Sequence, residues 1–221
     1  MKQDVNGLEV AILIINRDLA DKDYQYFMKF VSEEKRKRIE KYHFFSDRQN
    51  VLLADILARY EICRRTGMTN WQLDFSVNEY GKPYLVNDPH VQYNLSHSGK
   101  YIAFAIDSKP VGIDVEKIDH IDMKIAKRFF TSSEFSYINS QNCNMQIMSF
   151  YQIWTKKESY IKFEGKGLSI PLTSFNVISQ NNVAYHNMLE VDDAICTVCT
   201  EQKEAPPCHI ISLTDFLQYV N

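Results

Sequence analysis

Short apolar runs of strand length divide the first half of the chain. They predict strands at 8–15, through Tyr93 and Leu95, at 101–106 and at 111–116. Only the turn "DSKP" separates the last two runs, so these strands are expected to pair as an antiparallel hairpin.

Helical spacing of apolar residues fills the gap between the first two strands. One helix is predicted from Asp21 to about Val31. The sequence "SDRQ" (46–49) resembles a capping box, with Ser46 as N-cap and Gln49 reaching back, so a second helix is expected to begin there. Gly67 suits the C-terminal cap of that helix.

The second half also mixes helices and strands. It holds a predicted helix at 122–130, a capping box "TSSE" (131–134) that begins another, and a long helix from about Met145 to Phe163. Strands are predicted near 174–178, 194–199 and 207–212. The pattern predicts an α/β (α+β) protein with an N-terminal half, 1–108, joined tightly to a C-terminal half, 109–221.

Composition narrows the class of protein. The 221 residues are 45% apolar, enough for a sizeable core, and the net charge of -3 gives no general reason to expect nucleic acid as a partner. The apolar run 10–15 is too short to cross a bilayer and lacks the marks of a secretory signal. Five irregularly spaced cysteines fit reduced thiols, so a cytoplasmic protein without a membrane anchor is predicted.

One segment departs from the even spread of charge. The run "EKRKRIEK" contains the cations Lys35, Arg36, Lys37, Arg38 and Lys41. Such a run is either the solvated face of a helix or a local anion site.

Two carboxylates interrupt the apolar strand "VGIDVEKI" (111–118). Side chains alternate between the two faces of a strand, so Asp114 and Glu116 point to one face while Ile113 and Val115 point to the other. A strand with one face in the core and one in water has the same pattern. The strand alone does not decide between these interpretations.

A third carboxylate interrupts the inward stripe of the long predicted helix. Glu158 follows Trp154 at helical spacing, where an apolar residue is expected. A buried carboxylate needs a cation or hydrogen-bond donors, and Lys162 at i+4 supplies one candidate. If Asp114, Glu116 and Glu158 converge, one lysine does not balance their charge, and Mg²⁺ with phosphate oxygens suits such a site.

Several segments together resemble the motif series of the Sfp-type 4'-phosphopantetheinyl transferases. These segments are "YGKPYL", "YNLSHSG", "VGIDVEKI", "FFTSSE" and "WTKKESYIKFEGKGLSIPL", in this order and spacing. Each piece alone means little, but the set is hard to produce by chance. The resemblance runs from about Ser32 to Phe175. It implies two similar halves related by a pseudo-twofold axis, with the site in the cleft between them.

The resemblance also implies a reaction and roles for individual residues. Members of the family transfer 4'-phosphopantetheine from coenzyme A to a serine of an acyl or peptidyl carrier protein and release adenosine 3',5'-bisphosphate. Asp114, Glu116 and Glu158 would hold Mg²⁺, and Lys162 would contact the pyrophosphate. The other expected coenzyme A contacts are Lys35 and Arg38 near the 3'-phosphate, Lys82 near the nucleotide, and Ser96 and His97 on phosphates.

Some implications are weaker than others. Glu134 matches an acidic position of the family, but the capping box accounts for it equally well. Asn50 and Val51 stand where the family often has a basic residue and then Ser or Thr, which leaves 3'-phosphate binding open. Lys156, Lys166 and Leu168 are candidates for a rim that meets the carrier protein.

Other functions remain compatible with the residues. A different metal-dependent phosphodiester-cleaving enzyme would also use paired carboxylates with a distant Glu, although it would need a longer basic track. A non-catalytic module that binds coenzyme A or a carrier protein would not need three carboxylates. The resemblance favours a monomeric transferase, and the pathway that it serves, whether fatty acid, polyketide or nonribosomal peptide synthesis, is left open.

Overall fold

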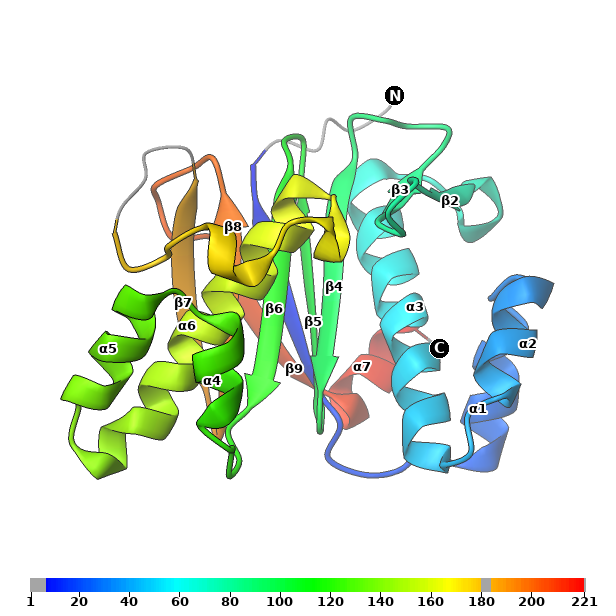
Figure 1. Cartoon of the computed structure of the whole chain (residues 1–221). Helices are drawn as coiled ribbons and strands as arrows, with labels where there is room; N and C mark the ends of the chain where they lie inside the picture. Colours follow the sequence, from blue (N-terminus) through cyan, green and yellow to red (C-terminus); the bar gives the residue numbers. More distant parts are fainter. Residues whose placement is uncertain (1–6, 180–183, 221) are drawn as a thin grey trace.

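Each half of the chain repeats one order of elements: a strand, two short helices, a long helix and an antiparallel strand pair. The structure, a computed structural model, describes residues 7–179 and 184–220 (Figure 1). The first half contains β1 (Glu9–Ile14), α1 (Asp21–Phe27), α2 (Glu33–Glu40), α3 (Phe45–Thr66), β4 (Gln92–Ser98) and β5 (Tyr101–Asp107). The second contains β6 (Val111–Lys117), α4 (Lys124–Phe129), α5 (Ser132–Ser140), α6 (Cys143–Glu164), β7 (Tyr185–Val191) and β8 (Ala194–Thr200).

The two halves also pair their strands in the same way. The order is β1-β5-β4 in the first half and β6-β8-β7 in the second, so in both halves the last strand pairs with the first. The predicted mixed fold of two similar halves is therefore confirmed. The boundary at 108 stays a prediction, because β9 (Cys208–Ser212) returns to pair in parallel with β1, and α7 (Leu213–Val220) follows it.

The remaining short elements are connections. A two-stranded ribbon of β2 (Phe75–Val77) and β3 (Pro83–Leu85) lies between α3 and β4, preceded by the 3-10 turn η1 (Asn70–Gln72). The turns η2 (Gly167–Ser169) and η3 (Leu172–Ser174) follow α6.

Alternation along the strands builds the core in layers. In β1, Val10 and Ile12 face the second sheet, while Ala11 and Leu13 face α3. Both sheets bury one face against each other, and a long helix covers each outer face: α3 on the first sheet and α6 on the second (Figure 1). Burial of this apolar surface is the main favourable term in folding.

The contact between β6 and α6 is unusually close. A Cβ on Gly112 would lie 2.0 Å from the carbonyl oxygen of Ser159 and 2.3 Å from the nitrogen of Phe163. Main chain therefore meets main chain here, and only glycine fits. This close approach brings the side chains of β6 beside those of α6.

The predicted hairpin of 101–106 with 111–116 is wrong. β5 pairs with β4 on one edge and with β1 on the other, so it has no free edge for β6. The turn at 108–110 carries the chain from one sheet into the next, where β6 pairs with β8. The strands themselves lie where the apolar runs predict them.

Several predicted local features also need correction. The α3 helix begins at Phe45 with Phe44 as its N-cap, so the predicted cap Ser46 lies inside the helix, and Gln49 donates to Asp18 and accepts from the amide of Leu19. The first helix ends at Phe27, four residues earlier than predicted. The predicted strand at 174–178 is absent. The amide of Val177 donates to Glu134, and the side-chain oxygen of Asn176 accepts from the amides of Ile178 and Ser179.

Other local predictions are confirmed. Thr131 and Glu134 form a reciprocal capping box at the start of α5. Gly67 ends α3 in the left-handed conformation, with φ 70°, as a C-terminal glycine cap requires. No helix within residues 7–179 and 184–220 is long and apolar enough to cross a membrane.

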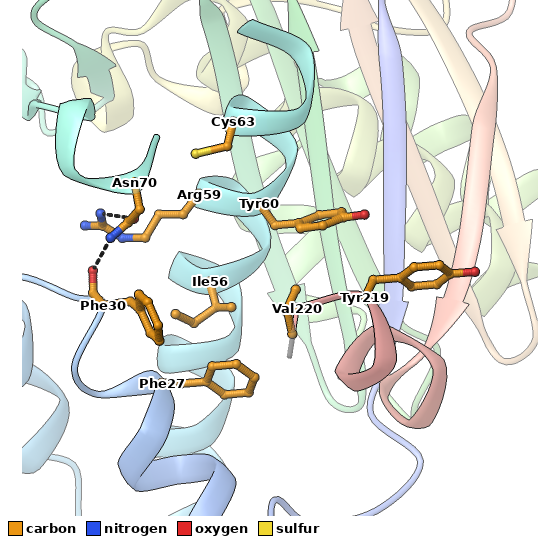
Figure 2. Close-up of a pocket in the computed structure, with 9 residues that line it drawn as sticks. All are labelled: Phe27, Phe30, Ile56, Arg59, Tyr60, Cys63, Asn70, Tyr219 and Val220. Atoms are coloured by element: carbon orange, nitrogen blue, oxygen red, sulfur yellow. Dashed lines mark hydrogen bonds between the residues drawn. The ribbon is translucent and has the colours of Figure 1, made fainter. Parts of the chain in front are cut away.

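A cavity of about 250 Å³ opens beside α3 in the first half (Figure 2). Its lining is mostly apolar, and two of its polar side chains are partnered, since Arg59 donates to Asp55 and to Asn70, and Asn70 donates to the carbonyl of Phe30. None of the predicted site residues lines it. The cavity is thus separate from the chemistry that the sequence predicts.

Candidate active site

The two halves meet along β4 and β6, which are joined by side chains in place of a main-chain ladder. Asn94 accepts from the amide of Ile113 at 2.9 Å, Ser96 donates to Asp114 at 2.9 Å, and Ser98 donates to Glu116 at 2.7 Å. In these three pairs the residue numbers increase together along β4 and β6, so the two strands run parallel. This β4–β6 seam places polar groups of one half against carboxylates of the other.

Lys162 joins the seam from α6. Its Nζ lies 2.7 Å from Oδ1 of Asp114 and donates to the hydroxyl of Ser96 at 2.8 Å. Ser96, Asp114 and Lys162, three residues that the sequence predicts for the site, are thus in direct contact although they lie on three separate elements. Asp114 is buried, whereas Lys162 keeps about a quarter of its side chain exposed, so the cluster opens toward solvent at the lysine.

Negative charge is in excess around this cluster. Burial raises the pKa of Asp114, although Lys162 and Ser96 oppose the shift. Burial and then the charge of Asp114 raise the pKa of Glu116. Burial and Asp114 likewise raise the pKa of Glu158, with a further contribution from Glu116. The three predicted carboxylates therefore lie within electrostatic range of one another, and Lys162 alone does not balance them.

One carboxylate oxygen in the cluster has no partner. Oδ2 of Asp114 is buried and forms no hydrogen bond, while Oδ1 accepts from both Ser96 and Lys162. A buried oxygen of this kind is costly unless a donor or a cation reaches it. Carboxylate oxygens are the ligands that Mg²⁺ prefers, so the donor set of Asp114, Glu116 and Glu158 fits this ion chemically.

The geometry does not, however, form a ready coordination sphere. Across residues 7–179 and 184–220, no three carboxylate, imidazole or thiol groups are gathered closely enough to hold a metal ion. The expected convergence of three oxygens on one point is not found in this arrangement, in which Lys162 and the serines bond to oxygens of Asp114 and Glu116. Magnesium binding stays a prediction.

The predicted phosphate contacts lie around the cluster to different degrees. Burial and the charges of Lys162 and Lys35 lower the pKa of His97, and Asp47 opposes this shift, so the ring is neutral near pH 7 and offers one N–H donor. Lys35 lies on α2, 3.4 Å from Asp55. Arg38 is exposed on the same helix. Within the cationic run, Lys35 lies in electrostatic range of His97.

Two further predicted positions have structural partners. Nζ of Lys82 donates to the carbonyls of Val111 and Phe163, at 3.0 and 3.2 Å. The side chain of Asn50 donates to the carbonyl of Gly99, so it ties α3 to the turn between β4 and β5. Neither side chain takes part in the contacts of the Asp114 cluster.

Ser98 is a site residue that the sequence analysis missed. It donates to Glu116 and accepts from the amide of Lys117. Its signal was available: Ser96 and Ser98 are two residues apart on one strand, as Asp114 and Glu116 are on the other. This signal can be recognised only when the two strands are known to lie side by side.

Comparison with known proteins identifies the family. The family model "4'-phosphopantetheinyl transferase, N-terminal" matches residues 19–109, and that of the "4'-phosphopantetheinyl transferase superfamily" matches residues 110–213. The chain is 41% identical over 170 residues to the 4'-phosphopantetheinyl transferase Sfp of Bacillus subtilis (strain 168), covering 77% of this chain and 76% of that protein. The chain belongs to the 4'-phosphopantetheinyl transferase superfamily.

Other members of the family are also similar in sequence. The transferase gsp of Aneurinibacillus migulanus is 37% identical, over 76% of this chain and 70% of its own. The transferase psf-1 of Bacillus pumilus is 36% identical, over 82% of this chain and 78% of its own. The predicted family and its enzymatic nature are confirmed, since these relatives are named as 4'-phosphopantetheinyl transferases.

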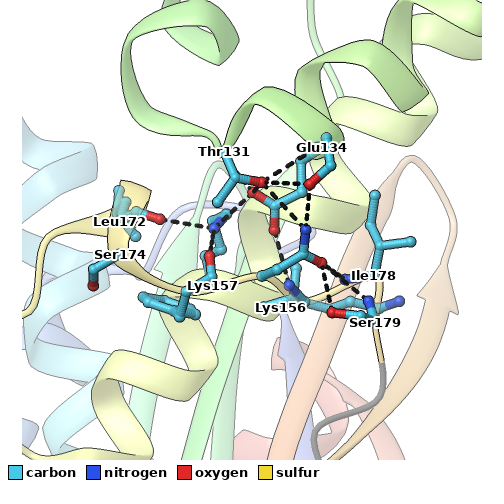
Figure 3. A network of polar contacts seen from close by, with 12 residues as sticks. Thr131, Glu134, Lys156, Lys157, Leu172, Ser174, Ile178 and Ser179 are labelled. Atoms are coloured by element: carbon cyan, nitrogen blue, oxygen red, sulfur yellow. Dashed lines mark hydrogen bonds and ion pairs between the residues drawn. The ribbon is translucent and has the colours of Figure 1, made fainter.

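Glu134, the fourth acidic position matching the family, is part of a buried structural network (Figure 3). It forms an ion pair of 2.8 Å with Lys157, and both side chains are fully buried. It also accepts from Thr131 and from the amide of Val177. Lys157 in turn donates to the carbonyls of Leu172 and Phe175. The capping box accounts for the bonds of Glu134 with Thr131, while its bonds with Lys157 and Val177 hold the segment after α6 against α5.

This network predicts a stability effect that a metal ligand would not show. Lys157→Met leaves Glu134 buried without its cation. We therefore expect the free energy of unfolding, measured in urea, to fall by about 3–5 kcal/mol. The exposed Lys127→Met is the matched control and should change the free energy of unfolding by less than about 0.5 kcal/mol. Equal effects of the two substitutions would contradict a structural role for the pair.

Proposed function

We propose that this protein transfers 4'-phosphopantetheine from coenzyme A to a serine hydroxyl of an apo acyl or peptidyl carrier protein. The product released from coenzyme A is adenosine 3',5'-bisphosphate. One observation carries the proposal beyond family membership: donors from Ser96 and Lys162 meet a surplus of carboxylates at the seam between the halves. Donors beside such a surplus suit a diphosphate that arrives with a divalent cation.

The chain's own residues have distinct tasks in this reaction. The serine oxygen attacks the β-phosphorus of coenzyme A, and the bond from that phosphorus to the oxygen of the departing bisphosphate breaks. Lys162 is placed to stabilise the negative charge that moves onto the leaving group. Glu158, whose pKa burial and Asp114 raise, is the candidate base for the serine proton.

Magnesium completes the proposal. Asp114, Glu116 and Glu158 would hold the ion, which when bound neutralises charge on the diphosphate oxygens. The oxygen chemistry of these side chains supports this assignment, as does the unpartnered Oδ2 of Asp114.

The nucleotide end of coenzyme A fits the first half. Lys35 lies in electrostatic range of His97, which adjoins Ser96 on β4. We assign Lys35 and Arg38 to the 3'-phosphate, and Ser96 and His97 to the other phosphates. Arg38 is exposed, and Lys35, although ion-paired with Asp55, keeps 30% of its side chain exposed, so an anion can reach both cations.

The carrier protein is assigned to the second half beside α6. Leu168 is 80% exposed on η2, and Lys166, two residues before it, is also exposed. An apolar side chain beside a lysine suits the small acidic carrier expected as partner. Lys156 is partly buried beside His186 and supports this rim less well. A monomeric, cytoplasmic enzyme is part of the same proposal.

The direct test is the mass of an apo carrier protein after incubation with coenzyme A and Mg²⁺. The wild type is expected to add one phosphopantetheine group. Asp114→Asn and Glu158→Gln should lower turnover at least about 100-fold while circular dichroism shows folded protein, because charge stabilisation and proton transfer are lost. The exposed Lys127→Met serves as control.

Each alternative has its own outcome in this assay. Cleavage of coenzyme A without carrier modification would indicate another phosphodiester-cleaving enzyme. Binding of coenzyme A with neither cleavage nor transfer would indicate a binding module. Near-normal turnover of Asp114→Asn in magnesium would reject the assignment of the metal ligands.

The cationic face of α2 generates a second prediction. If Lys35 and Arg38 bind the 3'-phosphate, replacing both with Met should raise KM for coenzyme A about 10-fold or more, because charge-assisted hydrogen bonds are lost. Dephospho-coenzyme A lacks that phosphate, so its KM should change little. Equal effects on both substrates, measured by carrier mass, would refute the assignment.

A further inference from the structure

The contact between β6 and α6 ends at a lysine from the other half of the chain. Lys82, in the turn between β2 and β3, donates to the carbonyl of Val111 on β6 and to that of Phe163 on α6. We infer that Lys82 is a positioning residue whose ammonium ties α6 to β6 and does not contact the nucleotide. The consequence for catalysis rests on the proposed function.

Bonds across the β6–α6 contact include the ion pair of Asp114 with Lys162 and, at the end of the contact, the tie from Lys82. Gly112 leaves main chain against main chain, at Ser159 and Phe163. No side chain at 112 interlocks with the helix, so bonds on either side of Gly112 set how the two backbones align along the contact. A sub-ångström slip there would move Lys162 relative to Asp114.

A second bond from the same turn acts in the same direction. The side-chain amide of Asn78 donates to the carbonyl of Gly165 at 2.7 Å, and its oxygen accepts from the amides of Tyr80 and Lys82. The last carbonyls of a helix lack partners within the helix and carry partial negative charge. The turn thus supplies an amide and a cation to the C-terminal end of α6.

The surroundings of Lys82 agree with an internal role. Burial lowers its pKa to about 8, while Cys199 and Glu164 oppose the shift. The side chain is still mostly in its ammonium form at pH 7, and the ammonium donates to two main-chain carbonyls. A side chain directed at a phosphate would instead be expected among other cations, as Lys35 is on α2, which also carries Lys37 and Arg38.

The tie lies next to the residues of the proposed reaction. Phe163 directly follows Lys162, and Val111 precedes Asp114 by three residues on the same strand. Loosening the two backbones should therefore weaken the contact of Lys162 with Asp114 before it affects binding of the distant nucleotide. The expected kinetic effect is on kcat rather than on KM for coenzyme A.

The test compares Lys82→Met, which keeps the unbranched stem, with the exposed control Lys203→Met. A second variant, Asn78→Asp, keeps the oxygen that accepts from Tyr80 and Lys82 but removes the donor to Gly165. For each full-length protein we would measure kcat, KM for coenzyme A, and backbone amide hydrogen exchange without substrate.

Lys82→Met is expected to lower kcat about 10-fold with KM within about twofold, and to speed exchange about 10-fold over 111–114 and 159–165. Asn78→Asp should also lower kcat and speed exchange, by smaller factors. Lys203→Met should change neither kcat nor exchange. A raised KM with normal kcat would overturn the inference and assign the ammonium to the nucleotide. Unchanged exchange in Lys82→Met would also overturn it.

The two proposals fail separately. If the wild type transfers nothing to any carrier, the proposed function fails. The exchange measurement needs no activity, so it still decides whether Lys82 ties α6 to β6.

Discussion

The ion pair between Lys162 and Asp114 connects the helix and the strand that carry the predicted carboxylates of the site. It joins α6 to β6, while Ser96 bonds to both side chains from β4 of the other half. The pair is not electrically sufficient, because Glu116 and Glu158 raise the local negative charge and Oδ2 of Asp114 stays without a donor. A site with unmet negative charge at the junction of two halves is suited to a cation and an anionic substrate together.

The surrounding fold keeps this arrangement rigid from two sides. Gly112 lets β6 and α6 approach until their backbones touch. The buried pair of Glu134 and Lys157 fixes the segment that follows α6. The structural ion pair and the site ion pair thus use lysines of the same helix, five residues apart, and Lys157 differs from Lys162 in its burial and its partners.

Local signals in the sequence predicted much of this, because they depend on neighbours in the chain. The capping box at Thr131, the glycine end of α3 and the alternation around Asp114 needed only short-range rules. Ser96 and Lys162 came from motif resemblance and do meet Asp114. The hairpin failed because β5 is enclosed by β4 and by β1, a strand distant in the sequence. The capping box at Ser46 failed because α3 begins at Phe45, which places Ser46 inside the helix, and Gln49 bonds to Asp18.

The central claim is that the carboxylates around Asp114 take a divalent cation, and Mn²⁺ binding tests it most directly. Electron paramagnetic resonance measures the free Mn²⁺ in a mixture of protein, coenzyme A and Mn²⁺. Subtracting this, and the Mn²⁺ that coenzyme A binds without protein, from the total gives the number of ions bound per chain. The account predicts one ion for the wild type and for Lys127→Met, with at least about 10-fold weaker binding in Asp114→Asn. Equal binding by wild type and Asp114→Asn would contradict it.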